Sequence, residues 1–523
     1  MKRTPSVKRQ DKARKRRIKK ARKLIAARER AVRRRIAHKA ERLDQPIFRA
    51  QNIQYEFAAR SRAIGCGGLG LMHALARECG LIESIDEHLE LLKFHFPYHE
   101  SDHVLNIAYN ALTGGRCLED LELKRSDEAY LDALGATRIP DPTTAGDFCR
   151  RFQSDDDIQS LQRAIDQARA RVWARQPQEF FEQATIDMDG HIVETTGECK
   201  QGMDITYDGR WGYHPLLLSL AQTGEPLGII NRSGNRPSHE GAAAAVNERI
   251  AVLRAAGFLK ILLRGDTDFS QTKYLDGWDA DGVLFHFGYD AAANLKALAD
   301  DLAKSQWTRL KRPPPYRVKT QPRAKPERVK ERIVVEREYK NLVLESEDVA
   351  EFEYRPTACK QAYRMIVVRK NLVEKQGQLQ LFEKVRYFFY ITNDRESSAA
   401  EVVFSCNDRC HQENLIEQLA NGPRALQAPV DNLYSNGAYM LMASLAWTLK
   451  AWAALWLPET GRWKERRRAE KYKLLRMEFR TFVNAIIRVP CQIVKTGRRI
   501  VYRVLHWNES QPVFWRLAEV LQC

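Results

Sequence analysis

The sequence lacks several features that would place it in a common class of protein. Its ten cysteines are scattered over 523 residues without a C-x-x-C pair, which argues against a disulfide scaffold or a zinc ribbon and is typical of reduced thiols in a cytosol. No run of about 18 apolar residues occurs, so no membrane span is expected. The basic start of the chain lacks the apolar segment of a secretory signal. These absences predict a cytoplasmic protein.

Acidic residues are scarce at the start of the chain, and the excess positive charge is concentrated there. Residues 1–40 contain 19 Lys and Arg but only two acids, whereas the remaining chain holds 66 basic and 65 acidic residues. A block of like charge stays unfolded until a polyanion binds it, and nucleic-acid phosphate is the natural partner. We therefore expect residues 1–45 to be a basic arm that is helical where it meets DNA. Its proposed DNA contacts are Arg14, Lys15, Arg16, Arg17, Arg33, Arg34 and Arg35.

The next part of the chain has the apolar spacing of helices, which predicts a helical N-terminal region over residues 46–175. We expect this region to bind DNA, because it contains a short capped helix with exposed arginines that could sit in a DNA groove. Within it, the segment 141–144 is a helix-start signal before 145–152. Phe148 and Phe152 are expected to face inward, with Arg150 and Arg151 toward DNA. An ordinary bundle helix is the alternative interpretation of this segment.

From residue 183 the periodicity changes to that of strands. Candidate strands are 184–189, 213–220, 227–230 and 260–263, with a helix over 241–256. Strands first, then strand and helix in alternation, indicate an α/β fold with a mixed sheet and helices packed against it.

The later part of the chain contains a second group of strand-like runs. A loop rich in Pro, Lys and Arg over 311–330 precedes runs at 332–338, 364–369 and 387–392. Helical spacing then returns. We predict that residues 176–305 and 396–457 form the α/β core, that residues 306–395 form a β-rich insertion, and that residues 458–523 form a basic helical C-terminal region.

Three acidic side chains stand near the ends of apolar strands. Asp189 lies near the end of one strand, Asp187 is two residues earlier on the same face, and Asp266 ends another strand. A carboxylate in such a place is costly unless a cation binds it, and Mg²⁺ prefers oxygen ligands. By spacing alone the signal is weak, and an ordinary surface loop is the default.

An ordered set of motifs strengthens this interpretation. The pieces are 185–189, 210–217, 232–235, 264–269 and 407–419. The set resembles the group 1 DDE domain of bacterial insertion-sequence transposases, of the kind found in the insertion sequence 1380-like family, over about residues 60–505. The last piece resembles a Y-x2-R-x3-E-x6-K signature, with Arg409 and Glu413 at the arginine and glutamate. Cys406 and Ala420 replace the tyrosine and lysine, which puts details of DNA-end binding in doubt.

The resemblance implies an RNase H-like mixed-sheet core interrupted by the β-rich insertion, with helical regions at both ends. It implies that Asp189, Asp266 and Glu413 hold two Mg²⁺ ions, for which Mn²⁺ can substitute, with Arg409 and Asp187 in support. Asp189 fits better than Asp187 as first acid because Gly190 follows it. Asp268 is an alternative to Asp266.

The resemblance also implies an activity and partners. The enzyme would bind the terminal inverted repeats of its element, cleave the ends and join them to target double-stranded DNA. It would act as a dimer in a synaptic complex, in the bacterial cytoplasm at the nucleoid and not at a membrane. Arg498 and Arg499 in the tail are expected to meet DNA. The alternatives are a nuclease that cuts without joining, and an inactive DNA-binding relic.

Overall fold

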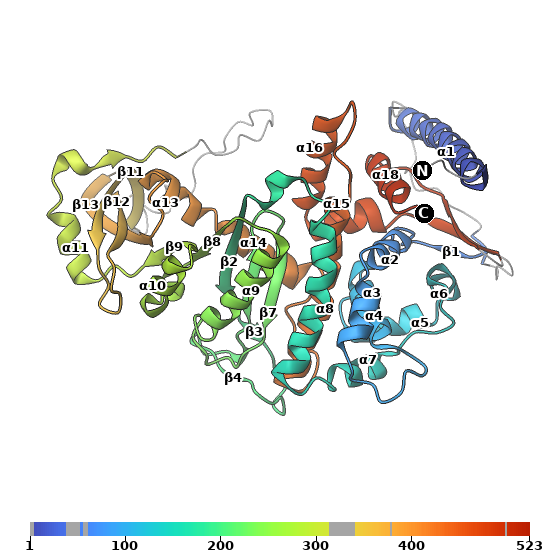
Figure 1. Ribbon diagram of the computed structural model, residues 1–523, viewed down its shortest axis with the longest axis horizontal. Coiled ribbons are helices and arrows are strands. Elements are labelled where there is room, and N and C mark those ends of the chain that lie inside the picture. Colours follow the sequence, from blue (N-terminus) through green and yellow to red (C-terminus); the bar gives the residue numbers. More distant parts are fainter. Residues whose placement is uncertain (1–4, 38–52, 56–60, 313–339, 377–378, 497–498) are drawn as a thin grey trace. The chain divides into compact units, whose positions relative to one another are not determined.

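The structure is a computed structural model that describes residues 5–37, 53–55, 61–312, 340–376, 379–496 and 499–523. The chain divides into two compact units (Figure 1). One unit comprises Met1–Phe148 with Leu445–Cys523, and the other comprises Cys149–Ser444. Across these described ranges, no helix is both long and apolar enough to cross a membrane.

The second unit is built on one large mixed sheet. Its central strands are β2 (Gln183–Gly190), β6 (Leu216–Leu220), β7 (Glu225–Ile230), β8 (Lys260–Gly265) and β9 (Leu284–Tyr289). β2 is antiparallel to β6 and β6 to β7, whereas β2 is parallel to β8 and β8 to β9. In chain order these five strands lie 3-2-1-4-5 across the sheet. This arrangement confirms the predicted RNase H-like α/β core.

Burial explains why the core strands read as apolar runs in the sequence. All five residues of β6 are buried, and so are five of the six residues of β8.

Helix α8 (Asp155–Trp173) starts with a capping box in which the Ser154 and Asp157 side chains bind each other's backbone N–H. It packs on α9 (Ala242–Ala256), which in turn contacts β7.

A buried ionic network fastens these two helices to the sheet edge. Arg169 of α8 contacts Asp166 and Glu225, and Arg249 of α9 also contacts Asp166. The Trp173 indole donates to Glu225, so the carboxylate on β7 is bonded from two sides. This network lies on α8, α9 and β7.

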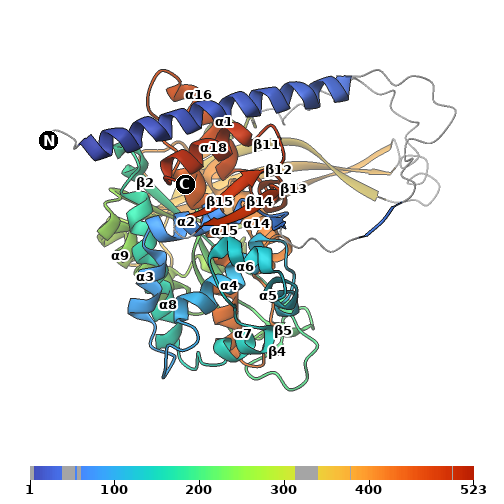
Figure 2. The same ribbon diagram turned by 90° about the vertical axis from the view of Figure 1, so that its right-hand side faces the viewer.

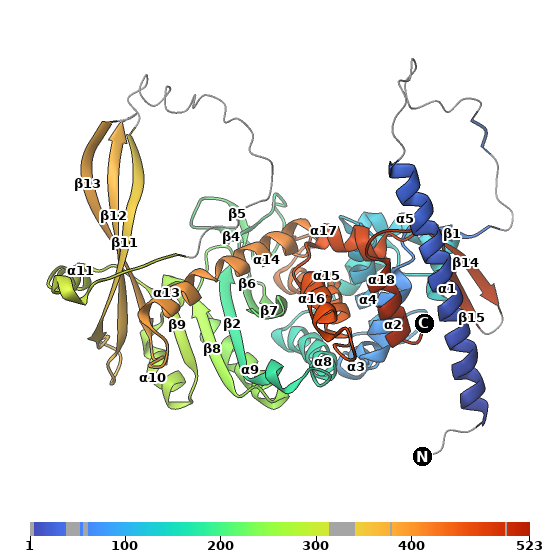
Figure 3. The ribbon, with the colours of Figure 1, turned by 90° about the horizontal axis from the view of Figure 1, so that it is seen from above.

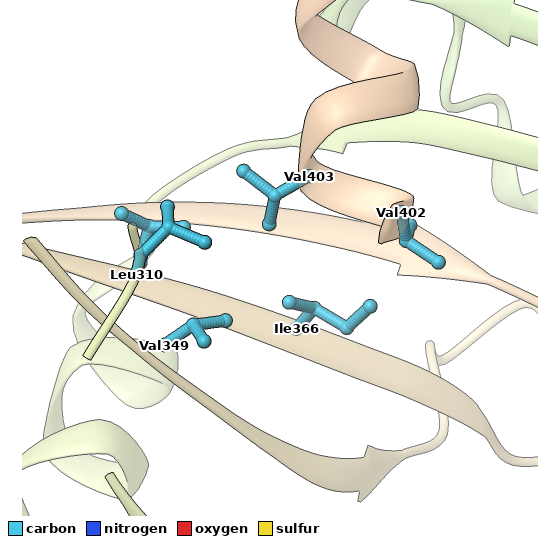
Figure 4. Packing of buried hydrophobic residues seen from close by; sticks show 6 residues of the cluster. Leu310, Val349, Ile366, Val402 and Val403 are labelled. Atoms are coloured by element: carbon cyan, nitrogen blue, oxygen red, sulfur yellow. The ribbon is translucent and has the colours of Figure 1, made fainter. Parts of the chain in front are cut away.

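The β-rich insertion extends the same sheet. It consists of β10 (Thr308–Arg309), β11 (Lys340–Tyr354), β12 (Tyr363–Gln376) and β13 (Leu379–Thr392), and β13 pairs with β9. The strands are longer than the predicted runs, and the predicted run 332–338 lies outside the described residues. A small core gives them a hydrophobic base (Figure 4): Leu310, Val349, Ile366, Val368, Val402 and Val403.

Two helices return the chain from the insertion to the core. Helix α13 (Ala399–Asn407) packs against β9, β11 and β13, and α14 (Cys410–Asn421) packs against β2. Figure 3 shows the two helices following one another across the sheet. The remaining elements of this unit are α10 (Thr272–Ala280), α11 (Ala293–Asp300) and a small sheet of β3 (Val193–Glu194), β4 (Asp204–Ile205) and β5 (Trp211–Tyr213).

The other unit is mainly helical, as predicted. Its N-terminal helices are α1 (Pro5–Ala37), α2 (Leu69–Glu78), α3 (Leu81–His88), α4 (Glu100–Leu112), α5 (Leu121–Arg125), α6 (Glu128–Leu134) and α7 (Pro142–Cys149). The C-terminal helices are α15 (Leu433–Leu455), which begins in the other unit, α16 (Lys464–Leu475), α17 (Phe479–Phe482) and α18 (Gln511–Val520).

The C-terminal region also contains a hairpin that the sequence did not predict. Strands β14 (Cys491–Thr496) and β15 (Arg499–Val504) pair with each other, and β1 (Ala63–Ile64) pairs with β14. Figure 2 shows α1 alongside α18 and this hairpin. Arg28 donates to the Val504 carbonyl over 3.4 Å, so the basic helix is connected to the C-terminal region.

Candidate active site

The topology of the sheet brings the first two acids to one edge. Strands β2 and β8 are adjacent and parallel, with Asp187 opposite Arg264 in the register. Asp189 stands two residues further along β2, and Asp266 two residues beyond Arg264. Because parallel strands end at the same edge, the two carboxylates emerge side by side. The Asp266 side chain also accepts from the Asp268 backbone N–H at 3.0 Å, which fixes its orientation.

Helix α14 brings the third acid to this edge. Its first turn carries Glu413, and Arg409 is the residue immediately before the helix. The helix is held on the sheet by Gln412, which is buried and bonded to Ser219 of β6. The face of α14 that carries Gln412 and the buried apolar side chains packs on the sheet and thereby positions Glu413, whose own side chain is mostly exposed.

The guanidinium of Arg409 is the meeting point of the three acids. Its Nη1 lies 3.2 Å from Asp189 Oδ2 and 3.6 Å from Asp266 Oδ2, and its Nη2 lies 3.8 Å from Glu413 Oε1. The structure thus brings together four residues that are separated by up to 224 positions in the sequence, around one positive charge. Three carboxylates against one guanidinium leave an excess of negative charge.

The pKa values of two of these acids, Asp189 and Asp266, are raised. The pKa of Asp189 is raised to about 6, chiefly by burial; the charge of Arg409 opposes this rise, and the charges of Asp266 and Glu413 add to it. Burial also raises the pKa of Asp266, again opposed by Arg409. Both shifts mean that the ionised carboxylates are under-compensated, so additional positive charge would stabilise them.

The donor set fits a divalent cation. It consists of carboxylate oxygens from three elements, the ligand type that Mg²⁺ and Mn²⁺ prefer. In the arrangement described, no three His, Cys, Asp or Glu side chains of the described ranges are close enough to one another to hold an ion. The acids converge on Arg409, so bringing a cation between them requires the guanidinium to move aside.

Asp187 and Asp268 occupy different surroundings from the three gathered acids. Asp187 is buried, with its two oxygens bonded to Arg264 at 2.6 and 2.8 Å. Burial raises the pKa of Asp187, and Arg264 opposes that rise. Asp268 is exposed, and its bond to Asp266 is made by its backbone. The ion pairs of Arg409 are instead formed with Asp189, Asp266 and Glu413.

The predicted DNA-binding residues lie on several elements. Arg14, Lys15, Arg16, Arg17 and Arg33–Arg35 are on α1, where the side chains of Arg16 and Arg33–Arg35 are exposed. Arg150 and Arg151 are exposed as expected, but α7 ends at Cys149, so they follow the helix rather than lie on it. Arg150 is bonded to Asp431 at 3.0 Å. Arg499 begins β15, and Arg498 lies outside the described residues.

Arg264 is a residue of this site whose role the sequence did not indicate. Asp187 and Arg264 each stand two residues before a predicted acid, on strands expected to be neighbours. Since side chains two apart share a face of a strand, that spacing was the signal that could have paired them.

Comparison with known proteins identifies the family. Residues 46–523 match the family described as Transposase DDE domain group 1. No curated protein matches the chain significantly. A solved structure described as a cryo-EM structure of piggyBac transposase synaptic complex with hairpin DNA is similar over 81% of this chain and 82% of its own, with 11% identity and a TM-score of 0.35. The family match covers most of the chain, and the chain therefore belongs to the group 1 family of transposases with a DDE domain.

Proposed function

We propose that this transposase binds the terminal inverted repeats of its element, cleaves the DNA at each end, and joins the freed 3′-hydroxyl to target DNA. The observation that carries the proposal is the convergence of Asp189, Asp266 and Glu413 on one guanidinium, from two strand ends and a helix. Such a cluster of under-compensated carboxylates is the arrangement that phosphoryl transfer with two metal ions requires.

In this proposal Asp189, Asp266 and Glu413 hold two Mg²⁺ ions, for which Mn²⁺ can substitute. The bound ions would activate the attacking oxygen and stabilise the leaving oxygen of the phosphodiester. The fold of the chain positions the three acids. The ends of β2 and β8 fix two acids on a rigid sheet, and α14 adds the third. When the Arg409 guanidinium moves away from the carboxylates, it would be free to bind a phosphate oxygen of the DNA at the site.

The proposed DNA contacts are the basic side chains of α1 together with Arg150, Arg151, Arg498 and Arg499. The exposed arginines of α1 support this, because a helix with so much positive charge on its surface favours the phosphate backbone. We further propose that two copies pair two DNA ends. The source is proposed to be a bacterial element of the insertion sequence 1380-like kind, which inverted repeats flanking the gene would support.

The test is a cleavage and joining assay on a supercoiled plasmid that carries the terminal repeats, with Mg²⁺. Asp266→Asn is expected to lose cleavage by at least about 1000-fold while it still binds the ends, since one acid of the cluster loses its charge. Asp268→Asn tests the alternative acid, and it is expected to retain cleavage because Asp268 is exposed and forms none of the ion pairs of Arg409 with the three acids.

The products separate the competing interpretations. Joined products support a transposase, whereas cleavage without joining supports a nuclease of the same fold. Full cleavage by the Asp266→Asn variant would refute the assignment of the site. A wild-type protein that binds the ends but never cleaves would support the inactive relic, although the three acids of the cluster are all present.

A further inference from the structure

A buried ion pair lies directly behind the acidic cluster. Arg264 of β8 donates from Nε to Asp187 Oδ1 at 2.6 Å and from Nη2 to Asp187 Oδ2 at 2.8 Å. The side chains are 8% and 1% exposed, respectively. Because each residue precedes an acid of the cluster by two positions, the pair joins β2 and β8 on the strand face that also presents Asp189 and Asp266.

The same guanidinium also reaches the helix that precedes the third acid. Arg264 Nη1 donates to the Ser405 backbone oxygen at 2.9 Å, near the end of α13. His286, which faces Arg264 in the β8–β9 register, holds the Ser405 hydroxyl over 2.9 Å through Nδ1. Ser405 is thus held at its carbonyl and at its hydroxyl, four residues before Arg409.

His286 extends the network to the insertion. Its Nε2 lies 3.3 Å from Asp394, which follows β13. Burial lowers the pKa of His286 to about 4, so the ring is neutral at pH 7. Since Asp394 can only accept, Nε2–H donates to it and Nδ1 accepts from the Ser405 hydroxyl. The end of the insertion and the end of α13 are therefore connected to β8 through hydrogen bonds.

We infer that Arg264 is a positioning residue that sets the distance between the acids on the sheet and the Arg409–Glu413 turn of α14, with Asp187 as its counter-charge and not as a metal ligand. The inference rests on the proposed function. Arg264 makes three bonds in two directions, two to the carboxylate of Asp187 on β2 and one to the backbone of Ser405 near the end of α13. Lysine cannot reproduce this geometry, because an ammonium lacks the planar fork of a guanidinium.

The expected effect of losing Arg264 is a loss of placement. Without it, Ser405 keeps the bond of its hydroxyl to His286 but loses the bond at its carbonyl oxygen, and the ion pair between β2 and β8 is lost. A displacement of about 1 Å in an active site can reduce the rate on the order of 100-fold. DNA affinity does not depend on this spacing, because Arg264 is buried and does not face the solvent.

The experiment compares Arg264→Gln with Arg249→Gln in the full-length protein. Arg249 is the matched control, since it is a buried arginine of the same unit that is bonded to Asp166 on α8 and does not contact the cluster. We expect Arg264→Gln to lower kcat for end cleavage about 100-fold, to raise the Mn²⁺ concentration for half-maximal rate, and to leave KM for DNA unchanged. We expect Arg249→Gln to lower the melting temperature comparably and to retain kcat within about threefold.

A double variant keeps the test available if Arg264→Gln fails to fold. The single change leaves the Asp187 carboxylate buried without its partner, which is strongly destabilising, whereas Asp187→Asn with Arg264→Gln buries neither charge. The double variant is expected to fold and to show the same loss of kcat as either single variant, because the two side chains act as one unit.

Three outcomes would overturn the inference. One is a kcat for Arg264→Gln, or for the double variant, that equals that of Arg249→Gln. Another is a complete loss of cleavage in Asp187→Asn while Arg264→Gln remains active, because Asp187 would then act on its own as a ligand. Full cleavage by Asp266→Asn in the same assay would refute the proposed function itself, and the inference with it.

Discussion

Arg409 competes with metal ions for the three acids, so its removal should tighten metal binding in the DNA-free protein. The guanidinium lies 3.2 to 3.8 Å from three carboxylate oxygens. At an effective dielectric constant of about 20, one such contact is worth roughly 4–5 kcal/mol before solvent screening. Asp266 and Glu413 are 36% and 61% exposed, so screening reduces the net competition to about 1–2 kcal/mol.

This magnitude corresponds to roughly a 5- to 30-fold decrease in the dissociation constant for Mn²⁺ in Arg409→Gln. Titration of free Mn²⁺ by electron paramagnetic resonance, without DNA, measures it directly. Arg236→Gln is the control, since Arg236 forms an exposed ion pair with Glu240 in the same unit. Mn²⁺ binding by Arg409→Gln that is equal to or weaker than that of the wild type would refute the reasoning.

Two further predictions concern the mainly helical unit, Met1–Phe148 with Leu445–Cys523. Lys450 is fully buried, with Nζ donating to the Leu475 carbonyl at 2.7 Å, and burial lowers its pKa to about 7. Between about pH 7 and pH 10 the unfolded chain binds a proton that the folded protein has released, so stability should rise with pH. Lys450→Met should flatten this rise in melting temperature; an unchanged slope would contradict it. Deleting residues 1–40 should weaken DNA binding and reduce its salt dependence, measured by fluorescence anisotropy at several salt concentrations, because about 19 cationic groups are lost. An unchanged salt slope would show that the arm does not contact DNA.

The core of the fold was predictable because its signals are local. The runs that became β2, β6, β7 and β8 are apolar and bounded by turn residues, and burial on both faces makes such runs plain in a sequence. The length of β12 was not predictable, because residues such as Lys370 and Asn371 are polar and find their partners on β11, more than twenty residues away.

The missed hairpin has a comparable cause. Cys491 and Ile493 are buried whereas Thr496 is exposed, which is the alternation of a strand. In the sequence this short pattern follows a longer apolar stretch around Phe479 and Phe482, whose helical spacing extended the prediction across it. The partner strand β1 comes from residues 63–64, and no local signal indicates that pairing.

Strand periodicity does not separate Asp187 from Asp189, and the preference for Asp189 came only from the family resemblance, through the Gly190 that follows it. Both residues lie on the same face of one strand, so their periodicity is identical. Arg264 distinguishes the two acids, because it donates to both carboxylate oxygens of Asp187, whereas Asp189 contacts Arg409. A partner 77 residues away thus distinguishes two neighbouring acids.

The pairing of β13 with β9 has a consequence for trimming this protein. Phe389 to Thr392 form a ladder with His286 to Tyr289, so the insertion completes the hydrogen bonding of a core strand. Excising the insertion would leave β9, with its buried Phe285 and Phe287, as an exposed edge strand whose unpaired backbone groups can pair with other molecules. A minimal version of this enzyme therefore needs a replacement strand beside β9, because shortening the chain alone would promote aggregation.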